Sequence, residues 1–66
     1  MITCEEFVKM SKILNIKMLA EECDIDYNRL YRISRGLQEF SITEMLKIEK
    51  VLREKFLIHI YSINNN

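Results

Sequence analysis

The 66-residue chain contains one glycine and no proline. Because these residues form most tight turns, their scarcity leaves few hairpin turns and favours helices. The longest apolar run, residues 56–60, is interrupted by His59 and is far too short to cross a membrane. The N-terminus is acidic and lacks an apolar segment, so no signal peptide is predicted. We therefore expect a cytoplasmic protein with no membrane partner.

Residues that commonly bind metals or act in catalysis are also scarce. The chain has one histidine, His59, and two cysteines, Cys4 and Cys23, which do not form a CxxC pair. Such a set does not make a structural zinc site. The sequence contains no glycine-rich loop and no pair of carboxylates placed for catalysis. It also has no nucleophilic residue at a spacing from a basic residue that would indicate a catalytic pair. We expect no catalytic residue, metal, cofactor or small-molecule substrate. Cys23 is interpreted as a small apolar residue at a helix end, with a disulfide or redox sensor as the alternative.

The charges are balanced in number but uneven in position. Ten basic and ten acidic residues give a formal net charge of zero, which argues against non-specific, charge-driven binding to nucleic acid. Residues 27–38, however, contain three arginines and no acid, while acids gather on either side. The hydrophobic content of 48% is enough for the core of one compact domain, residues 1–66, although so short a chain is marginally stable.

Two helices are predicted in the first part of the chain. Thr3 and Glu6 match a capping box, which would open a helix that runs to about Leu14. Asn15 is the expected N-cap of a second helix, residues 16–23. Apolar residues at helical spacing mark the faces that should turn inward, namely Phe7, Met10 and Leu14 in the first helix and Met18, Leu19 and Ala20 in the second. Lys9 and Lys12 would then be exposed, as solvated lysines or as phosphate contacts.

A short turn, residues 24–26, leads to a third helix, residues 27–35, which Gly36 should end. Ile25, Leu30 and Ile33 are expected to face the core. The outward residues would be Tyr27, Asn28, Arg29, Tyr31, Arg32 and Arg35.

This outward surface suits an anionic partner that is rich in hydrogen-bonding groups, and nucleic acid is the obvious candidate. Asn28 could pair with adenine and Arg32 with guanine, because their side chains can each form two parallel hydrogen bonds. Arg35 is expected at the DNA backbone, and Gln38 is a further candidate for a phosphate contact.

The fourth helix is predicted to open at Ser41 and Glu44, a second capping box. Its inward face is assigned to Met45, Ile48 and Leu52, and Phe40 is expected to anchor the preceding loop in the core. The charged residues of this helix have mixed signs and are interpreted as a solvated face: Lys47, Glu49, Lys50, Arg53 and Glu54.

Residues 55–63 are rich in β-branched and aromatic side chains, which favour a strand. A lone strand cannot satisfy its own backbone groups, so pairing with the same strand of a second copy is predicted. The interface would contain Phe56, Ile58, Ile60 and Tyr61. The alternative continues the helix to about Ile63, and either form predicts a homodimer because the segment is too apolar to stand alone in water.

Residues 14–52 resemble the Cro/repressor helix-turn-helix family of bacterial and phage transcription regulators. The resemblance is carried by Leu19-Ala20, Ile25-Asp26, Leu30, Ile33 and Arg35-Gly36, and by Met45, Leu46, Ile48 and Leu52 after them. It implies a mainly α, compact four-helix domain with its helix-turn-helix motif at residues 16–36. It also implies a sequence-specific regulator, a repressor like those of phages and mobile elements, that binds a two-fold symmetric operator in double-stranded DNA as a homodimer.

The chain departs from this family at three positions. Asp24 stands where the family usually has glycine in the turn, and Asp tolerates a left-handed backbone better than most residues. Ile16 and Tyr27 stand where the family often has glutamine. The resemblance therefore implies that the phosphate contact of the first glutamine is either absent or made by Lys17, and that no base preference can be transferred to Tyr27. The missing glutamine contact, the zero net charge and the apolar tail motivate an alternative, a protein-interaction module such as an antirepressor or an inhibitor of a host protein.

Overall fold

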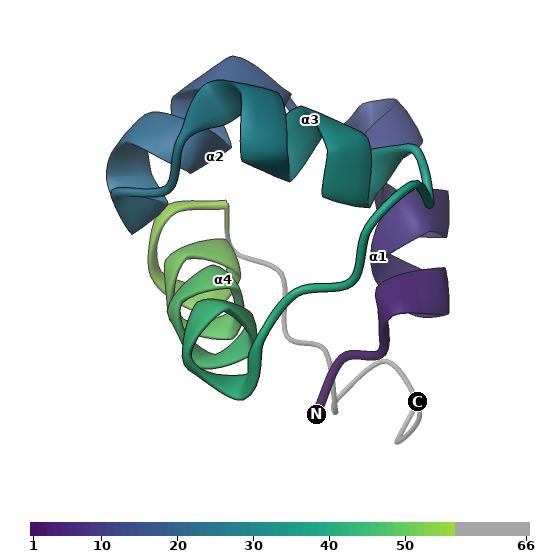
Figure 1. The fold of residues 1–66 in the computed structure, drawn as a ribbon. Coiled ribbons are helices and arrows are strands. Elements are labelled where there is room, and N and C mark those ends of the chain that lie inside the picture. The colour runs from purple at the N-terminus through teal and green to yellow at the C-terminus, as the bar shows by residue number, and fades with distance from the viewer. Residues whose placement is uncertain (57–66) are drawn as a thin grey trace.

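The computed structural model describes residues 1–56 (Figure 1). The chain order is α1 (Cys4–Met10), the 3-10 turn η1 (Ser11–Ile13), α2 (Ile16–Cys23), α3 (Tyr27–Ser34) and α4 (Ile42–Lys55). Within these 56 residues there is no strand. The prediction of a mainly helical domain with four helices is therefore confirmed for the described residues. The predicted interface residues Ile58, Ile60 and Tyr61 lie outside them.

Two of the helices cross one end of the molecule above the other two. In Figure 1, α2 and α3 run across the top, with α1 to the right below them and α4 to the left below them. α2 packs against both α3 and α4, and α1 packs against α3. This arrangement leaves the side of α3 that points away from α1 and α4 on the surface.

Six large side chains fill the centre and are almost completely inaccessible to solvent: Phe7, Leu19, Leu30, Ile33, Ile48 and Leu52. Smaller or less completely enclosed apolar residues surround them, and Phe40 packs edge-on against Phe7 with ring centroids 6.1 Å apart. The predicted inward faces of α1, α3 and α4 and the loop anchor Phe40 are therefore confirmed.

The predicted helix starts are confirmed by their caps. Thr3 Oγ1 accepts the Glu6 N–H at 3.1 Å, and the Glu6 carboxylate accepts the Thr3 N–H at 2.9 Å. Asn15 Oδ1 accepts the Met18 N–H at 3.0 Å at the start of α2. These side chains satisfy N–H groups that have no partner within their own helix, which fixes where each helix begins.

The first helix is shorter than predicted. α1 ends at Met10 and continues as the 3-10 turn η1, while Leu14 is extended (φ −108°, ψ 146°). The hydroxyl of Ser11 lies 2.7 Å from the Val8 carbonyl oxygen, so it supplies a hydrogen bond to the last turn of α1. Serine side chains compete in this way with the helical backbone pattern, and a 3-10 turn is a common way for a helix to end.

Met18 is not a core residue, contrary to the prediction, because 44% of its surface is exposed. The buried side of α2 is formed by Leu19, Ala20 and Cys23, with Ile16 packed at its edge. Successive helical residues are rotated by about 100°, so Met18 projects roughly opposite the middle of that side. The apolar triplet at residues 18–20 spans too wide an arc to be buried as a whole.

Glu49 was predicted on the solvated face of α4, and this prediction is wrong. Only 7% of its surface is exposed, because it lies on the same side of the helix as Met45, Ile48 and Leu52. Its carboxylate accepts a hydrogen bond from the N–H of Ile2, whose side chain is also buried. This contact makes burial of a carboxylate tolerable and ties the N-terminal segment to α4.

Cys23 is buried in the core, as its interpretation as a small apolar residue requires. Its Sγ lies 3.7 Å from the Lys47 carbonyl oxygen, to which the thiol donates. Burial raises the pKa of this thiol to about 11, although Lys47 opposes the shift. The thiol is therefore protonated at neutral pH and poorly reactive.

α4 extends through Lys55, so the predicted strand does not begin at that residue. Phe56 follows as the C-cap and is half-buried against the core of its own chain. The part of Phe56 that packs inward is therefore not available for the predicted contact with a second copy.

α2 and α3 both end in the same hydrogen-bond pattern around a left-handed residue. After α2, Asp24 has φ 55°, and the Ile25 N–H donates to the Ala20 carbonyl at 3.0 Å. After α3, Gly36 has φ 78°, and the Leu37 N–H donates to the Arg32 carbonyl at 2.9 Å. Left-handed backbone favours glycine, so Asp24 pays a conformational cost that Gly36 does not.

An Asp24→Gly variant is expected to be more stable than the wild type by about 0.5–1 kcal/mol. Glycine adopts a left-handed backbone without strain, and the change also removes a negative charge from the C-terminus of α2. The larger freedom of glycine in the unfolded chain opposes part of this gain. Urea unfolding followed by circular dichroism measures the difference.

The matched control is Gly36→Ala, which should lose about 1 kcal/mol at the equivalent position of α3. An added Cβ would lie 3.8 Å from Val8 Cγ2, an ordinary contact, so the loss would come from the backbone conformation alone. A destabilised Asp24→Gly variant would contradict the assignment of strain to Asp24.

Candidate nucleic-acid interface

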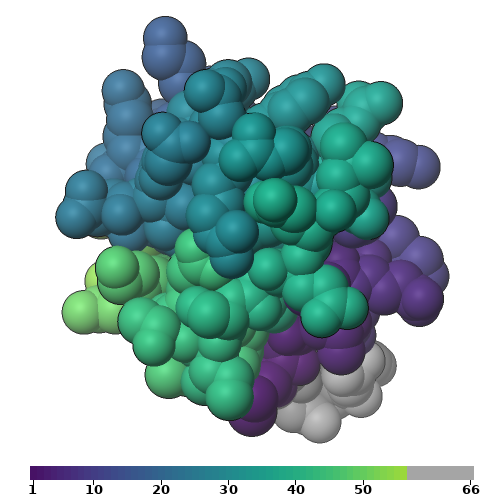
Figure 2. Space-filling view, in the orientation of Figure 1, coloured from purple at the N-terminus to yellow at the C-terminus, as the bar shows by residue number. Residues whose placement is uncertain are grey.

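The local sequence fixes where α3 begins and which side it buries. Asp26 is its N-cap and accepts the Arg29 N–H at 3.1 Å. Leu30, Ile33 and Ser34 are buried, so the opposite side of the helix faces solvent. Figure 2 shows side chains of residues 27–35 covering the upper part of one face of the molecule.

Three polar residues occupy the middle of this exposed side. At about 100° per residue, Asn28, Arg32 and Arg35 project within roughly 60° of one another. All three are exposed. Residues 27–38 contain no acid, so this strip carries positive charge and amide hydrogen-bonding groups without an acidic neighbour along its own helix.

Two tyrosines form the flank of α3 that lies toward α2. Tyr27 and Tyr31 are 45% and 43% exposed, and their ring centroids lie 6.1 Å apart. The guanidinium carbon of Arg35 lies 5.8 Å from the centroid of the Tyr31 ring, within the range of a cation–π interaction. The Tyr31 ring therefore restrains Arg35 and leaves its charge near the surface.

A shallow groove of about 330 Å³ separates this flank from η1 and the start of α2. Its basic and phenolic lining residues are Lys12, Lys17, Tyr27, Tyr31 and Arg35. No acidic side chain of the described residues lines it. Three cations from separate segments thus converge on one groove beside the α3 strip, and Lys12 joins Lys17 there although sequence reasoning left its role open.

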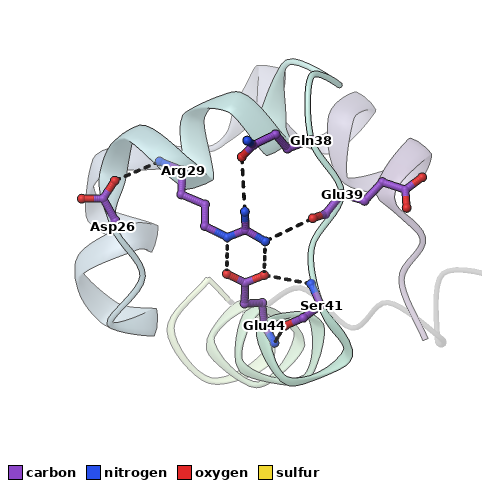
Figure 3. A network of polar contacts seen from close by, with 6 residues as sticks. All are labelled: Asp26, Arg29, Gln38, Glu39, Ser41 and Glu44. Carbon is purple, nitrogen blue, oxygen red and sulfur yellow. Dashed lines mark hydrogen bonds and ion pairs between the residues drawn. The ribbon is translucent and has the colours of Figure 1, made fainter.

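Arg29 differs from Arg32 and Arg35, because its guanidinium is held by contacts within the protein, although 36% of its side chain is exposed (Figure 3). Its Nε lies 2.6 Å from Glu44 Oε2 and its Nη2 lies 2.8 Å from Glu44 Oε1, so the ion pair is bidentate. Nη2 also donates to the Glu39 carbonyl and Nη1 to Gln38 Oε1, both at 3.2 Å. The contact joins α3 to the first turn of α4.

Glu44 is held from two sides. Besides the guanidinium of Arg29, its carboxylate accepts the Ser41 N–H at 2.8 Å as part of the predicted capping box. The hydrogen bonds with Arg29 and with the Ser41 backbone lower the pKa of Glu44 to about 2, against the effect of burial. The same hydrogen bond with Glu44 raises the pKa of Arg29 above its ordinary value.

This pKa predicts an acid-dependent loss of stability. A carboxyl group whose pKa is lower in the folded chain contributes stability above its ordinary pKa of 4.5, and the contribution is lost as the pH falls toward 2. The difference in unfolding free energy between wild type and Glu44→Gln should therefore shrink between pH 5 and about 2. Urea unfolding across that range measures it, and a difference that stays constant with pH would contradict the assignment.

The predicted contact residues divide into two groups. Those on the α3 strip and around the groove lie together on one side of the molecule: Lys17, Tyr27, Asn28, Tyr31, Arg32 and Arg35. The others, Arg29 and Gln38, are hydrogen-bonded to each other, and Arg29 is also paired with Glu44 of α4. The role of Glu44 could not be predicted from the sequence, because its partner Arg29 lies fifteen residues away and the capping box already explains a glutamate at this position.

No cluster of three or more His, Cys, Asp or Glu able to hold a metal ion occurs in residues 1–56. In the same part of the chain, none of the helices is both long enough and apolar enough to span a membrane. Comparison of the chain with protein-family models, with curated proteins and with solved structures finds no match.

Proposed function

We propose that this chain is a small DNA-binding transcription regulator that inserts α3 into the major groove. The observation that carries the proposal is the exposed strip of Asn28, Arg32 and Arg35 on a helix whose other side is buried in the core. The major groove of DNA admits one α-helix, and it presents acceptors and donors that amide and guanidinium groups can pair with. Asn28 is assigned to adenine, Arg32 to guanine and Arg35 to the backbone.

The groove beside α3 supports the same orientation. Lys12 and Lys17 come from η1 and α2, and they line this groove together with Tyr31 and Arg35. A duplex centred on the α3 strip would bring a phosphate backbone close to this groove, where lysines can neutralise it and tyrosine hydroxyls can donate hydrogen bonds. Positive charge concentrated on one side also explains how a chain of zero net charge can bind DNA.

We further propose that the regulator acts as a homodimer on a two-fold symmetric operator, with half-sites about one helical turn apart. The proposed mechanism is occlusion, in which the bound dimer blocks polymerase at its own or a neighbouring promoter. The apolar composition of residues 56–63 motivates the dimer.

Selection of duplexes from random oligonucleotides by the purified protein tests the proposal. A consensus with two-fold symmetry is expected, and its half-site centres should lie about 10 base pairs apart. Mobility-shift assays on that duplex should show affinity falling steeply with salt, with each phosphate contact contributing roughly 0.9 to the slope of log affinity against log salt. If no duplex is enriched at low salt, the chain is not a DNA-binding regulator.

A second candidate function is a protein-interaction module on the same scaffold. Ile42 and Leu46, one turn apart on α4, are 72% and 54% exposed, so this helix carries an apolar surface that the described residues do not cover. Such a surface is typical of a protein contact. A stoichiometric protein partner combined with no DNA binding at low salt would favour this candidate.

A further inference from the structure

The Arg29 guanidinium is nearly saturated by contacts within the protein. It has five N–H donors, and within residues 1–56 it makes four hydrogen bonds, which go to Glu44, Glu39 and Gln38. Its charge is matched by a carboxylate at hydrogen-bond distance, so the pair as a whole is neutral. An arginine held in this way offers little to a phosphate or a base, although it belongs to the helix proposed to enter the groove.

The contact with Arg29 also determines how the Gln38 amide is turned. A guanidinium donates hydrogen bonds and accepts none, so the amide atom facing it must be the oxygen. The Gln38 Oε1 is therefore taken by Arg29 at 3.2 Å, and the amide nitrogen Nε2 is at the other end of the group (Figure 3). Gln38 is exposed, and no hydrogen bond within residues 1–56 uses Nε2.

We propose that Arg29 is a positioning residue and that Gln38 makes the DNA contact in its place. Glu44 holds Arg29, Arg29 fixes the amide oxygen of Gln38, and Nε2 of Gln38 donates to a phosphate oxygen of the DNA backbone. The inference rests on the proposed function, and it removes Arg29 from the set of residues that touch DNA. It also assigns Glu44, a residue of α4, to the alignment of the interface.

The salt dependence of binding distinguishes positioning from contact. The double variant Arg29→Gln/Glu44→Gln removes one charge of each sign and keeps the net charge. Mobility-shift titrations on the selected duplex should show a several-fold loss of affinity with no change in the log–log salt slope. The matched control is Arg35→Gln at the C-cap of α3, for which the slope should fall by about 0.9 because a phosphate contact is lost. An equal fall in the double variant would overturn the inference.

A second measurement tests whether Arg29 acts through Gln38. Gln38→Ala should reduce affinity several-fold in the wild-type background, where the amide is held. In the Arg29→Gln/Glu44→Gln background the same change should have little further effect, because residues that act as one unit do not give additive losses. Equal fold-losses in the two backgrounds would show that Gln38 and Arg29 act independently.

Two further results keep the test decisive. Circular dichroism checks that the double variant folds. If that variant does not fold, the exchanged pair Arg29→Glu/Glu44→Arg takes its place. The exchanged pair should keep the wild-type salt slope, whereas a carboxylate at a position that contacts DNA would abolish binding.

The outcomes separate the two proposals. Wild-type protein that binds no duplex overturns the proposed function and this inference together. Wild-type binding with a reduced slope in the neutral or exchanged pair overturns this inference alone.

Discussion

A Leu30→Ala variant is expected to lose about 2–5 kcal/mol of unfolding free energy. Leu30 is completely buried on the inner side of α3, within the cluster of core residues. The change removes apolar contacts and leaves a cavity, and both effects destabilise the folded chain. A domain of this length has a total stability of only about 3–10 kcal/mol, so a large fraction of the variant should be unfolded at 37 °C.

The matched control is Leu46→Ala, the same substitution at a residue of α4 that is 54% exposed. It should change the unfolding free energy by less than about 0.5 kcal/mol. Urea unfolding of both variants, followed by circular dichroism at 222 nm, gives the comparison. Similar losses for Leu30 and Leu46 would mean that α3 does not pack on the core as described.

Replacing Arg32 with alanine is expected to remove most of the preference for one base pair in each half-site. A bidentate contact between an arginine and guanine contributes about 1–3 kcal/mol of discrimination, which corresponds to roughly 5-fold to 150-fold in affinity ratio. Arg32 is exposed in the middle of the α3 strip, so its removal should leave the fold intact. Asn28→Ala should have the same effect at an adenine position. Mobility-shift competition between the selected duplex and single-base variants measures both.

Lys50→Ala provides the control, since Lys50 is also exposed and basic but lies on α4. It should leave the discrimination between duplexes unchanged. If Arg32→Ala and Asn28→Ala both bind and discriminate like the wild type, α3 does not read the groove. A loss of affinity that is equal for all duplexes would instead assign these residues to the DNA backbone.

Local rules were enough to predict the helices. The caps Thr3, Asn15 and Ser41 each act within three residues, so sequence alone placed the helix starts correctly. The buried residues Leu30 and Ile33 follow from helical spacing in the same way. Such features depend on one helix at a time, which is why they can be predicted without knowing how the helices pack.

Features that depend on packing between helices were predicted less well. The partner of Arg29 is set by where α4 docks against α3, and nothing within α3 indicates it. Met18 became exposed because the docking of α2 selected Ala20 and Cys23 as its inner side. Glu49 is different, since it stands four residues after Met45 and three before Leu52, and that spacing alone could have placed it on the buried side.

The carboxylate of Glu44 has two roles. It caps the first turn of α4, and it binds the guanidinium of Arg29 on α3. Fraying of that first turn would therefore also free the Arg29 guanidinium, while the buried side chains of α3 stay packed in the core. We expect the amide protons of residues 44–46 to exchange with solvent faster when the Arg29–Glu44 contact is removed. A ligand that immobilises α3 would then slow exchange at the start of α4 without touching it.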